Sequence, residues 1–591
     1  MTNWKKGMAL TLAAVTVAAT VLSGCGSTSG SSGSTSDDAL SFTYLLDKGA
    51  SSVFYDEYED NPVAQYWMDM DWDVDGETKK ISVDFITPPS GSESDYLNTL
   101  LATGEYPDVM SMSYSSESAM KLYEEGIALD ITDYVEQYMP NYMAYIEEKN
   151  AWGSVTNDID GERRIIQLYQ MNDRASDMWG GFMYRRDWIL EYGTNPETGE
   201  AFTGGWNDDH SEWEDDIVFP SGNTDPIYIS DWEWMLDIFA TAEKELGMTD
   251  GIVMTLYYPG YLGTGDFCSG FGASAGWYLD EDGVAQYGGT SDNFRAYIEC
   301  MQAWYENGWI DKSFDERTTD IFFNIDSADT YSGKVGACYG EMSLLGDAIA
   351  NPDDPYLENA MFVGAPQPIN DVYGDDSCKY NEPTVYFANS EIDTPIIITN
   401  KAEEKDIAAL LTAIDYLYSY EGSLLRSRGF SDEIQAEIQN EFYNEHGLSD
   451  GAYNIEQDEA GNDMIIYHTD ELTAETDLEE AAIFQRIVGG AIQEIDRGYD
   501  SMRRRSLSNW SKYSTTGTIT SLVTNQLTSD QTDEDSQINT NITTAADQKV
   551  ADFVTGRADI EDDAEWQAYC DEINSYGPEK YSANINAALG N

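Results

Sequence analysis

Alternating apolar and polar residues mark two early strands in this chain. Residues 40–46, LSFTYLL, and residues 80–87, KISVDFIT, both alternate as half-buried strands do. A helix is predicted after the second strand, because Leu97, Leu100 and Leu101 have helical spacing and Gly104 ends the run. Val109 begins a further strand. This order of strand, helix and strand predicts an α/β layer structure.

Three later stretches carry one apolar face at helical spacing. The first spans residues 229–247, where Ser230 and Glu233 predict a capping box and Gly247 ends the helix. The others span residues 291–310 and 404–422. We interpret their apolar faces as core contacts rather than binding sites.

Three polar stretches rich in turn-forming residues separate these elements. They are residues 194–216, 444–463 and 528–548. Their composition predicts loops or insertions.

The composition narrows the class of protein. The chain has 591 residues, of which 109 are acidic and 31 basic, giving a formal charge of −78. This balance argues against nucleic acid as a partner, because phosphates are bound by Lys and Arg. The 41% hydrophobic and 13% aromatic content predicts folded cores rather than disorder. The length fits two or more domains.

The first 24 residues have the layout of a secretory leader. Lys5 and Lys6 precede the apolar residues 8–22, and a small pair, Ser23 and Gly24, follows. The apolar run is shorter than a membrane-spanning helix needs. Residues 22–25, LSGC, resemble the lipobox of bacterial lipoproteins, which implies cleavage before Cys25 and lipid on its sulfur.

An ordinary leader with a chance cysteine is the alternative interpretation. Residues 26–36 contain only Gly, Ser and Thr. Such a segment is a flexible tether with a mean reach of roughly 20 Å. We take residues 1–24 as the leader and 25–38 as the lipidated cysteine with its linker.

The cysteine pattern does not indicate a disulfide framework. With Cys25 lipidated, five widely spaced cysteines remain and no CxxC pair exists, and three histidines argue against a zinc site. One bridge among the five stays open. They are Cys268, Cys300, Cys338, Cys378 and Cys570.

Several motifs in order resemble the extracellular solute-binding proteins of bacterial ABC importers, in the maltodextrin-binding-like group. The motifs are GEYPDVM at 104–110, GIALDITDYV at 126–135, YRRDWILEYG at 184–193, YENGWIDKSF at 305–314 and YSGKVGACYG at 331–340. The resemblance covers nearly the whole mature chain. The chain departs from the family pattern in its length and in its three polar stretches.

The resemblance implies two α/β lobes joined by a hinge, with ligand in a cleft between them. It places the hinge crossings at residues 164–170, near 332–340 and at 387–400. Lobe one is then expected to contain residues 39–170 and 340–395. Lobe two is expected to contain residues 171–339 and 396–591.

Sugars are bound by aromatic ring faces and by hydrogen bonds from carboxylates, amides and arginine. Positions in the family pattern select nine candidate ligand contacts against the alternative that each packs in a core. They are Ser113, Tyr114, Arg174, Asp177, Trp179, Trp277, Tyr339, Glu341 and Trp510.

Residues 71–77, DWDVDGE, contain the first half of a calcium loop. Asp71, Asp73 and Asp75 have the required spacing, and Gly76 allows the sharp turn. Position twelve is Ser82 rather than a bidentate Glu, and a strand follows instead of a helix. Calcium is therefore a speculative cofactor here, and we expect no other.

The basic run SMRRRSLS, residues 501–508, is interpreted as pairing with neighbouring carboxylates.

The functional expectation is a lipid-anchored protein on the outer face of the cell membrane. It captures an oligosaccharide or sugar and delivers it to a membrane permease, without catalysis, and we expect a monomer. Three alternatives stay open. They are a surface glycoside hydrolase with paired carboxylates, a binder of peptides, and an adhesion module.

Overall fold

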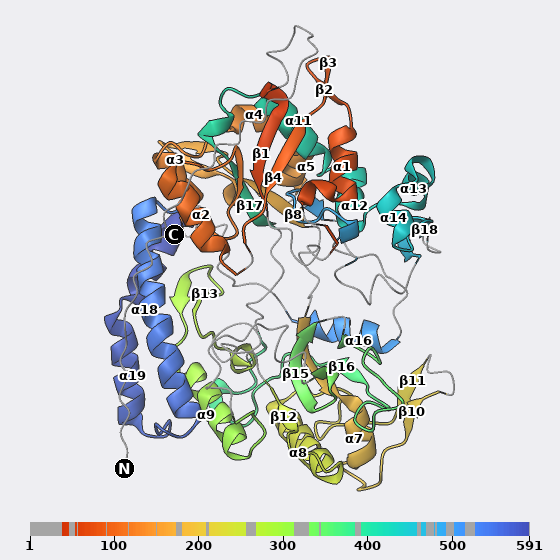
Figure 1. The fold of residues 1–591 in the computed structure, drawn as a ribbon. Coiled ribbons are helices and arrows are strands. Elements are labelled where there is room, and N and C mark those ends of the chain that lie inside the picture. The colour runs from red at the N-terminus through yellow and green to blue at the C-terminus, as the bar shows by residue number, and fades with distance from the viewer. Residues whose placement is uncertain are drawn as a thin grey trace, which may run out of the picture.

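Two α/β lobes make up the structure (Figure 1). The computed structural model describes residues 38–46, 54–55, 57–89, 91–115, 117–148, 151–172, 180–207, 212–255, 267–312, 330–341, 344–383, 392–457, 463–468, 478, 481–491, 501–513 and 526–589. Each lobe has its own sheet and its own buried core.

Lobe one is built on a six-stranded sheet in the order β20-β8-β17-β5-β1-β4. Strand β17 is antiparallel to both neighbours, and the other pairs are parallel. The strands are β1 (Ser41–Leu45), β4 (Ser82–Ile86), β5 (Val109–Ser111), β8 (Leu168–Asn172), β17 (Ile392–Ile398) and β20 (Gly490–Ala491).

Helices cover both faces of this sheet because its strands alternate in the side chains they present. Tyr44 and Ile396 lie in one core, while Leu45 and Ile397 lie in the other. The first face is covered by α1 (Pro62–Asp69), α4 (Thr132–Tyr138), α5 (Pro140–Glu148), α11 (Ile407–Tyr416) and α12 (Tyr420–Arg428). The second is covered by α2 (Glu93–Thr103) and α3 (Ala119–Glu124).

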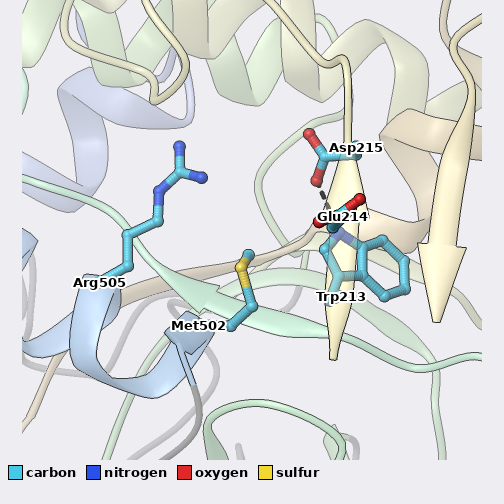
Figure 2. Close-up of a pocket in the computed structure, with 5 residues that line it drawn as sticks. All are labelled: Trp213, Glu214, Asp215, Met502 and Arg505. Carbon is cyan, nitrogen blue, oxygen red and sulfur yellow. Dashed lines mark hydrogen bonds between the residues drawn. The ribbon is translucent and has the colours of Figure 1, made fainter. Parts of the chain in front are cut away.

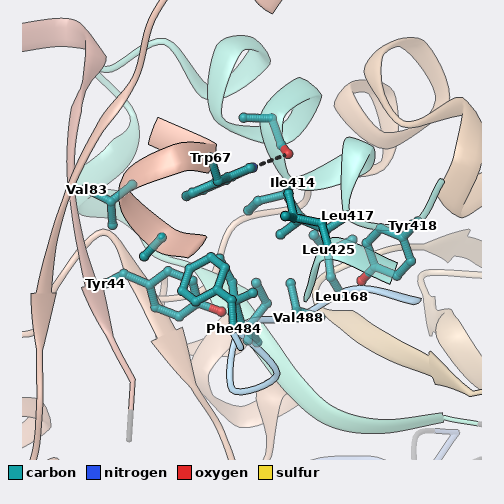
Figure 3. Close-up of a cluster of buried hydrophobic side chains, with 14 of the residues drawn as sticks. Tyr44, Trp67, Val83, Leu168, Ile414, Leu417, Tyr418, Leu425, Phe484 and Val488 are labelled. Atoms are coloured by element: carbon teal, nitrogen blue, oxygen red, sulfur yellow. Dashed lines mark hydrogen bonds between the residues drawn. The ribbon is translucent and has the colours of Figure 1, made fainter. Parts of the chain in front are cut away.

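The larger core of lobe one joins chain segments that are far apart in sequence (Figure 3). The indole nitrogen of Trp67 on α1 donates to the carbonyl oxygen of Ala413 on α11, 2.9 Å away. Phe484 and Val488, which precede β20, are fully buried in the same cluster. The segment from β17 to β20 is therefore an integral part of lobe one.

Lobe one also carries peripheral elements. They are the hairpins β2 (Trp72–Val74) with β3 (Glu77–Lys79), β6 (Asn157–Ile159) with β7 (Glu162–Arg164), and β18 (Tyr453–Gln457) with β19 (Asp463–Tyr467), together with α6 (Trp152–Val155), α13 (Asp432–Ile438) and α14 (Glu441–Glu445).

Lobe two is built on a four-stranded sheet in the order β12-β15-β9-β16. Its strands are β9 (Gly180–Arg185), β12 (Ile252–Met254), β15 (Val335–Glu341) and β16 (Phe362–Gly364). Its helices are α7 (Arg186–Tyr192), α8 (Ile229–Glu245), α9 (Asp292–Glu306), α16 (Ser501–Trp510), α18 (Ser529–Val554), α19 (Asp563–Ser575) and α20 (Pro578–Ala588). Two hairpins complete it, β10 (Gly204–Trp206) with β11 (Trp213–Asp215), and β13 (Trp277–Leu279) with β14 (Ala285–Tyr287).

The expected division of the chain between the lobes is corrected at two places. Residues 396–488 contribute to the lobe-one core rather than to lobe two. The segment 340–365 contributes to lobe two, because β15 and β16 both pair with β9. A sequence motif does not reveal which of the two sheets a strand joins, because its pairing partners are distant in the sequence.

The polar stretch 528–548 is a helix and not the predicted loop. It forms most of α18, where the hydroxyl of Thr528 and the side chain of Gln531 make a reciprocal capping box. Ile538, Ile542 and Ala546 recur every four residues and are buried in lobe two. The polar residues between them face away from that core, which explains the low overall hydrophobicity.

The capping box predicted at Ser230 and Glu233 is also corrected. Helix α8 begins at Ile229, and the carboxylate of Asp231 accepts from the backbone nitrogen of Tyr228 at 3.0 Å. Glu233 instead accepts hydrogen bonds from Trp304 and Tyr373. The carboxylate of Glu233 therefore bonds to residues distant in the sequence instead of capping its own helix.

Across the described ranges, no helix combines the length and apolar character needed to cross a membrane.

Candidate functional site

The carboxyl ends of the parallel strands of lobe one lie on one edge of its sheet. Strands β1, β4, β5, β8 and β20 all run toward this edge, and β17 begins there. The backbone nitrogen of Met112, just after β5, donates to Pro395 at 2.8 Å. In open α/β sheets, ligands bind outside this edge.

Lobe two presents a matching edge. Strand β15 ends at Glu341, which pairs with Gly180 at the start of β9. Strand β16 runs antiparallel to β9, so it ends at the same edge, at Gly364. Strand β9, the first described element after β8, begins at this edge.

Three chain segments, called crossings below, join a described part of lobe one to a described part of lobe two. They are residues 173–179, 384–391 and 492–500, which lie outside the described residues. Eight peptide steps separate Asn172 from Gly180, so their Cα atoms lie within about 28 Å of each other. The region between the edges is the candidate ligand-binding site.

The expected crossings agree with these positions in part. The segment 164–170 leads into the first crossing, and 387–400 begins within the second. The expected crossing near 332–340 is wrong, because Val335–Glu341 form β15 inside lobe two. The third crossing, at 492–500, was not predicted.

Ser113 and Tyr114 lie at the lobe-one edge, in the turn after β5. Ser113 is exposed, and its hydroxyl lies 3.2 Å from that of Ser111. The carbonyl oxygen of Tyr114 accepts a hydrogen bond from Ser94 at the start of α2. Both residues lie in the turn after β5 from which the resemblance selected them, and their role as ligand contacts stays a prediction.

The candidates in the first crossing and on β15 have different outcomes. Arg174, Asp177 and Trp179 lie outside the described residues. Glu341 ends β15 at the lobe-two edge. Tyr339 is buried, and its ring packs edge to face on Phe182 at 5.4 Å between centroids. Tyr339 is therefore a core residue.

Trp510 is corrected from a ligand contact to a core residue. Its side chain is only 4% exposed, and its indole nitrogen donates to the carbonyl oxygen of Phe182 at 2.8 Å. A Cβ atom on Gly181 or Gly364 would lie 2.5 Å or 2.7 Å from the indole. These two glycines make room for the ring, which fastens α16 to the sheet.

Trp277 packs within lobe two. Its ring stacks on Tyr581 of α20 with centroids 4.0 Å apart, so the protein itself covers one ring face. A hydrogen bond from its indole nitrogen to Pro578 fixes it further. This contact holds the β13–β14 hairpin against α20, where a cavity of about 410 Å³ lies between β14 and the helix.

A cavity of about 400 Å³ lies between α16 and β11 in lobe two. Figure 2 shows Arg505 of α16 on one side of it and the carboxylates of Glu214 and Asp215 on the other, with Met502 between them. Trp213 of β11 also lines the cavity, but its side chain is 5% exposed. The wall therefore offers mainly charged hydrogen-bonding groups.

Ion pairs hold the charged groups of this cavity in place. Asp215 accepts two hydrogen bonds from Arg186, at 2.6 Å and 2.7 Å. Burial raises the pKa of Asp215, but the hydrogen bonds and charge of Arg186 outweigh it, so the pKa lies below its ordinary value. Arg505 pairs with Asp225 at 2.8 Å, as expected for the basic run.

The speculative calcium loop is a β-hairpin. Val74 pairs with Glu77, so Asp75 and Gly76 form a two-residue turn with φ of 56° and 83°. Positive φ at both positions is the pattern of a type I′ turn. Asp73 accepts from the backbone nitrogen of Gly76, and Asp75 accepts from Tyr138.

Asp73 thus stabilises the turn, Asp75 binds Tyr138 of α4, and Asp71 is exposed. The calcium interpretation of Asp71, Asp73 and Asp75 is therefore corrected. Within the part of the chain that the structure describes, no group of three or more His, Cys, Asp or Glu residues could hold a metal ion.

The five cysteines after Cys25 are free thiols buried in lobe two. No bridge joins them.

The cavity beside α16 was not predicted from the sequence. Trp213, Glu214 and Asp215 lie in a stretch interpreted as a loop, and they are nearly 300 residues from Arg505. The one usable signal was the basic run around Arg505 in an acidic chain.

Comparisons with known proteins give the fold. No protein-family model matches the chain, and no curated protein sequence matches it. Among solved structures, the ABC-transporter substrate-binding protein FusA of Streptococcus pneumoniae in complex with kestose is 15% identical, with a TM-score of 0.62 over 93% of this chain and 98% of that chain.

Two further structures are similar over the same extent. An HMO-binding, ABC-transporter-associated solute-binding protein from Bifidobacterium longum infantis is 16% identical, with a TM-score of 0.63 over 93% of this chain and 99% of that one. Alginate-binding protein AlgQ2 without calcium ion is 14% identical, with a TM-score of 0.62 over 94% of this chain and 98% of that one. These likenesses show the two-lobed α/β fold of solute-binding proteins.

Proposed function

We propose that this chain is the substrate-binding protein of an ABC importer and that it captures an extracellular oligosaccharide. In this role it binds the ligand between its lobes and delivers it to a membrane permease, without catalysis. The observation that carries the proposal is the pair of sheet edges joined by three crossings. That arrangement supports a ligand region at the edges where most strands of both sheets end.

The carbohydrate class is supported by the proteins that share the fold. Those structures are described as binding kestose, HMO or alginate, and they match nearly the full length of both chains. The chemistry of the lobe-one edge is compatible with sugars, since Ser113 and Tyr114 offer hydroxyls and an aromatic ring.

We further propose that the first crossing contributes to the site. Arg174, Asp177 and Trp179 would supply a cation, a carboxylate and a ring face on the segment that joins β8 to β9. Calcium is not part of this proposal. A FusA structure is described as an EF-hand mutant, but the calcium interpretation of residues 71–77 is replaced by a hairpin.

A lipid anchor at Cys25 would place the protein where a permease needs its ligand delivered. Residues 26–36, which contain only Gly, Ser and Thr, would then stand between the lipid and the first described residue, Asp38. Cys25→Ser tests this anchor. We expect a folded protein that is released into the medium or left uncleaved, and membrane retention after correct cleavage would contradict the anchor.

A thermal-shift screen with the unlipidated domain tests the binding function. Fructo-oligosaccharides, alginate oligosaccharides, human milk oligosaccharides and peptides form the panel. A ligand at 100 times its Kd stabilises the folded state by about 2.7 kcal/mol. We expect stabilisation by an oligosaccharide, with the sugar recovered intact by chromatography.

Each other outcome of the screen has a distinct meaning. Release of shorter sugars would replace the proposal with glycoside hydrolysis. Stabilisation by peptides alone would change the ligand class, and no response to any member of the panel would contradict carbohydrate binding by these classes.

A further inference from the structure

Helix α18 belongs to lobe two along most of its length. Ile538, Ile542 and Val550 are buried in the lobe-two core. Near its far end, the carbonyl oxygen of Phe553 accepts a hydrogen bond from Gln302 of α9 at 2.9 Å. With 26 residues, the helix is a rod of about 39 Å. Figure 1 shows it running along one side of both lobes.

The beginning of this rod contacts lobe one. The side-chain amide of Gln526 donates to the carbonyl oxygens of Gly153 and Thr156, at 2.8 Å and 2.6 Å. The hydroxyl of Ser529 donates to the carboxylate of Glu124 on α3, at 2.5 Å. All three acceptors belong to lobe one.

One of the two residues between these contacts, Leu527, is held by lobe two. Leu527 is buried against Ala285 of β14 and Ile585 of α20. Gln526 contacts lobe one and the next residue, Leu527, contacts lobe two. The chain between these two contacts is therefore too short to extend when the lobes move apart.

One pair of opposite charges, Lys121 of α3 and Asp533 of α18, also lies across the boundary between the lobes. The pKa of Lys121 on α3 is raised, chiefly by its hydrogen bond to Glu117, with a smaller contribution from Asp533 of α18 across the lobe boundary. An isolated exposed pair of this kind contributes little to stability. The two hydrogen-bonding side chains are thus the main link.

We propose that Gln526 and Ser529 form a latch between the lobes, which sets the separation at which lobe one is held relative to lobe two. The α18 latch, defined as these two side chains and their three acceptors, is a mechanical link in addition to the three crossings. Rotation of the lobes must break or rearrange it, because α18 is rigid and fixed to lobe two. The proposal rests on the two-lobed fold and is independent of which ligand is bound.

Single-molecule energy transfer between the lobes tests the latch without a ligand. Labels are placed at Glu136→Cys on α4 and Lys244→Cys on α8, both exposed, in a Cys25→Ser background. The other cysteines are buried. In Gln526→Ala with Ser529→Ala, we expect the interlobe distance distribution to shift or broaden relative to the parent.

A matched variant provides the control. Gln537→Ala with Thr540→Ala removes the same types of group from α18, but their hydrogen bonds stay within the helix and they are exposed. Its distance distribution should superimpose on the parent. If the latch variant also superimposes while its circular dichroism shows an intact helix, the latch is overturned.

Two single substitutions of opposite charge at Ser529 test the latch if the double variant folds poorly. Ser529→Glu places a carboxylate against Glu124 and should push the lobes apart, with an effect that weakens at high salt. Ser529→Lys should pair with Glu124 and keep the parent distribution. Identical distributions for Ser529→Glu and Ser529→Lys would contradict the latch.

Discussion

The guanidinium of Arg426 on α12 donates a hydrogen bond to the side-chain oxygen of Gln170 on β8. The same group donates to the carbonyl oxygen of Gly490 on β20 at 3.2 Å. One buried cation therefore ties together the two strands that lead into the first and third crossings. Burial lowers the pKa of Arg426 to about 10, so it remains a cation at neutral pH.

Replacing this arginine should destabilise lobe one. Arg426→Met keeps much of the side-chain length but leaves the carbonyl oxygens of Ile487 and Gly490 without their donor. An unsatisfied buried acceptor costs about 1–3 kcal/mol, so we expect a loss on the order of 3 kcal/mol in chemical denaturation followed by tryptophan fluorescence. Arg557→Met, which removes an exposed pair with Asp552, should change stability by less than about 0.5 kcal/mol. Equal stabilities of the two variants would refute this role.

The space around Trp510 should be sensitive to one added methyl group. Gly181→Ala places a Cβ atom 2.5 Å from the indole, so we expect a loss on the order of 1–3 kcal/mol from overpacking. Trp510→Ala should cost about 3–5 kcal/mol. Gly153→Ala meets no atom within 4 Å in its helix and serves as the control in thermal unfolding. A Gly181→Ala protein as stable as this control would show that the indole can move aside.

Asp535 should make the stability of lobe two depend on pH. Its side chain is 5% exposed, and burial raises its pKa from 3.8 to about 6. The folded state favours the protonated carboxyl group of Asp535. Its contribution to the free energy of unfolding is therefore complete below the unfolded pKa and is lost as the pH rises through about 6. Asp535→Asn should therefore stabilise the protein by on the order of 2 kcal/mol near neutral pH.

The same substitution should have little effect near the unfolded pKa, where both states are largely protonated. Asn584 donates to Asp535 at 2.7 Å, and Glu534 and Lys580 are the charged neighbours. Asp571→Asn on the exposed side of α19 controls for loss of one negative charge. The prediction fails if Asp535→Asn gives the same change in Tm at both pH values.

The hairpin at Asp75 should not respond to calcium. Asp73→Asn and Asp75→Asn together should leave any difference in Tm between calcium and chelator unchanged, because these side chains serve the turn. Gly76→Ala should destabilise the hairpin by about 1 kcal/mol, since its φ is 83°. Loss of a calcium response in the aspartate variant would restore the metal interpretation.

Tyr114 should matter for ligand binding and little for stability. With an oligosaccharide identified in the screen, Tyr114→Ala should weaken binding by about tenfold, the loss of roughly 1.4 kcal/mol. Tyr134 is 38% exposed on α4, and Tyr134→Ala is the matched control measured by calorimetry. Equal affinities of the two variants would remove Tyr114 from the site.

The local elements of this protein follow from residues that are close together in the chain. Gly104 and Gly247 end their helices as predicted, each with a positive φ that glycine adopts without a steric penalty. The apolar faces of α9 and α11 are buried as their spacing predicted. These features depend on residues a few positions apart, so a linear pattern carries them.

The meeting of distant elements depends on the folded structure. Strand β17 belongs to lobe one because it pairs with β5 and β8. These partners lie more than two hundred residues away in the sequence, so no local pattern reveals the pairing. Trp510 became a core residue because Gly181 and Gly364 leave room for its ring, and α18 became a helix because lobe two buries its sparse isoleucines. Such contacts gain their free energy from surfaces that exist only once both partners have folded, so no local pattern can contain them.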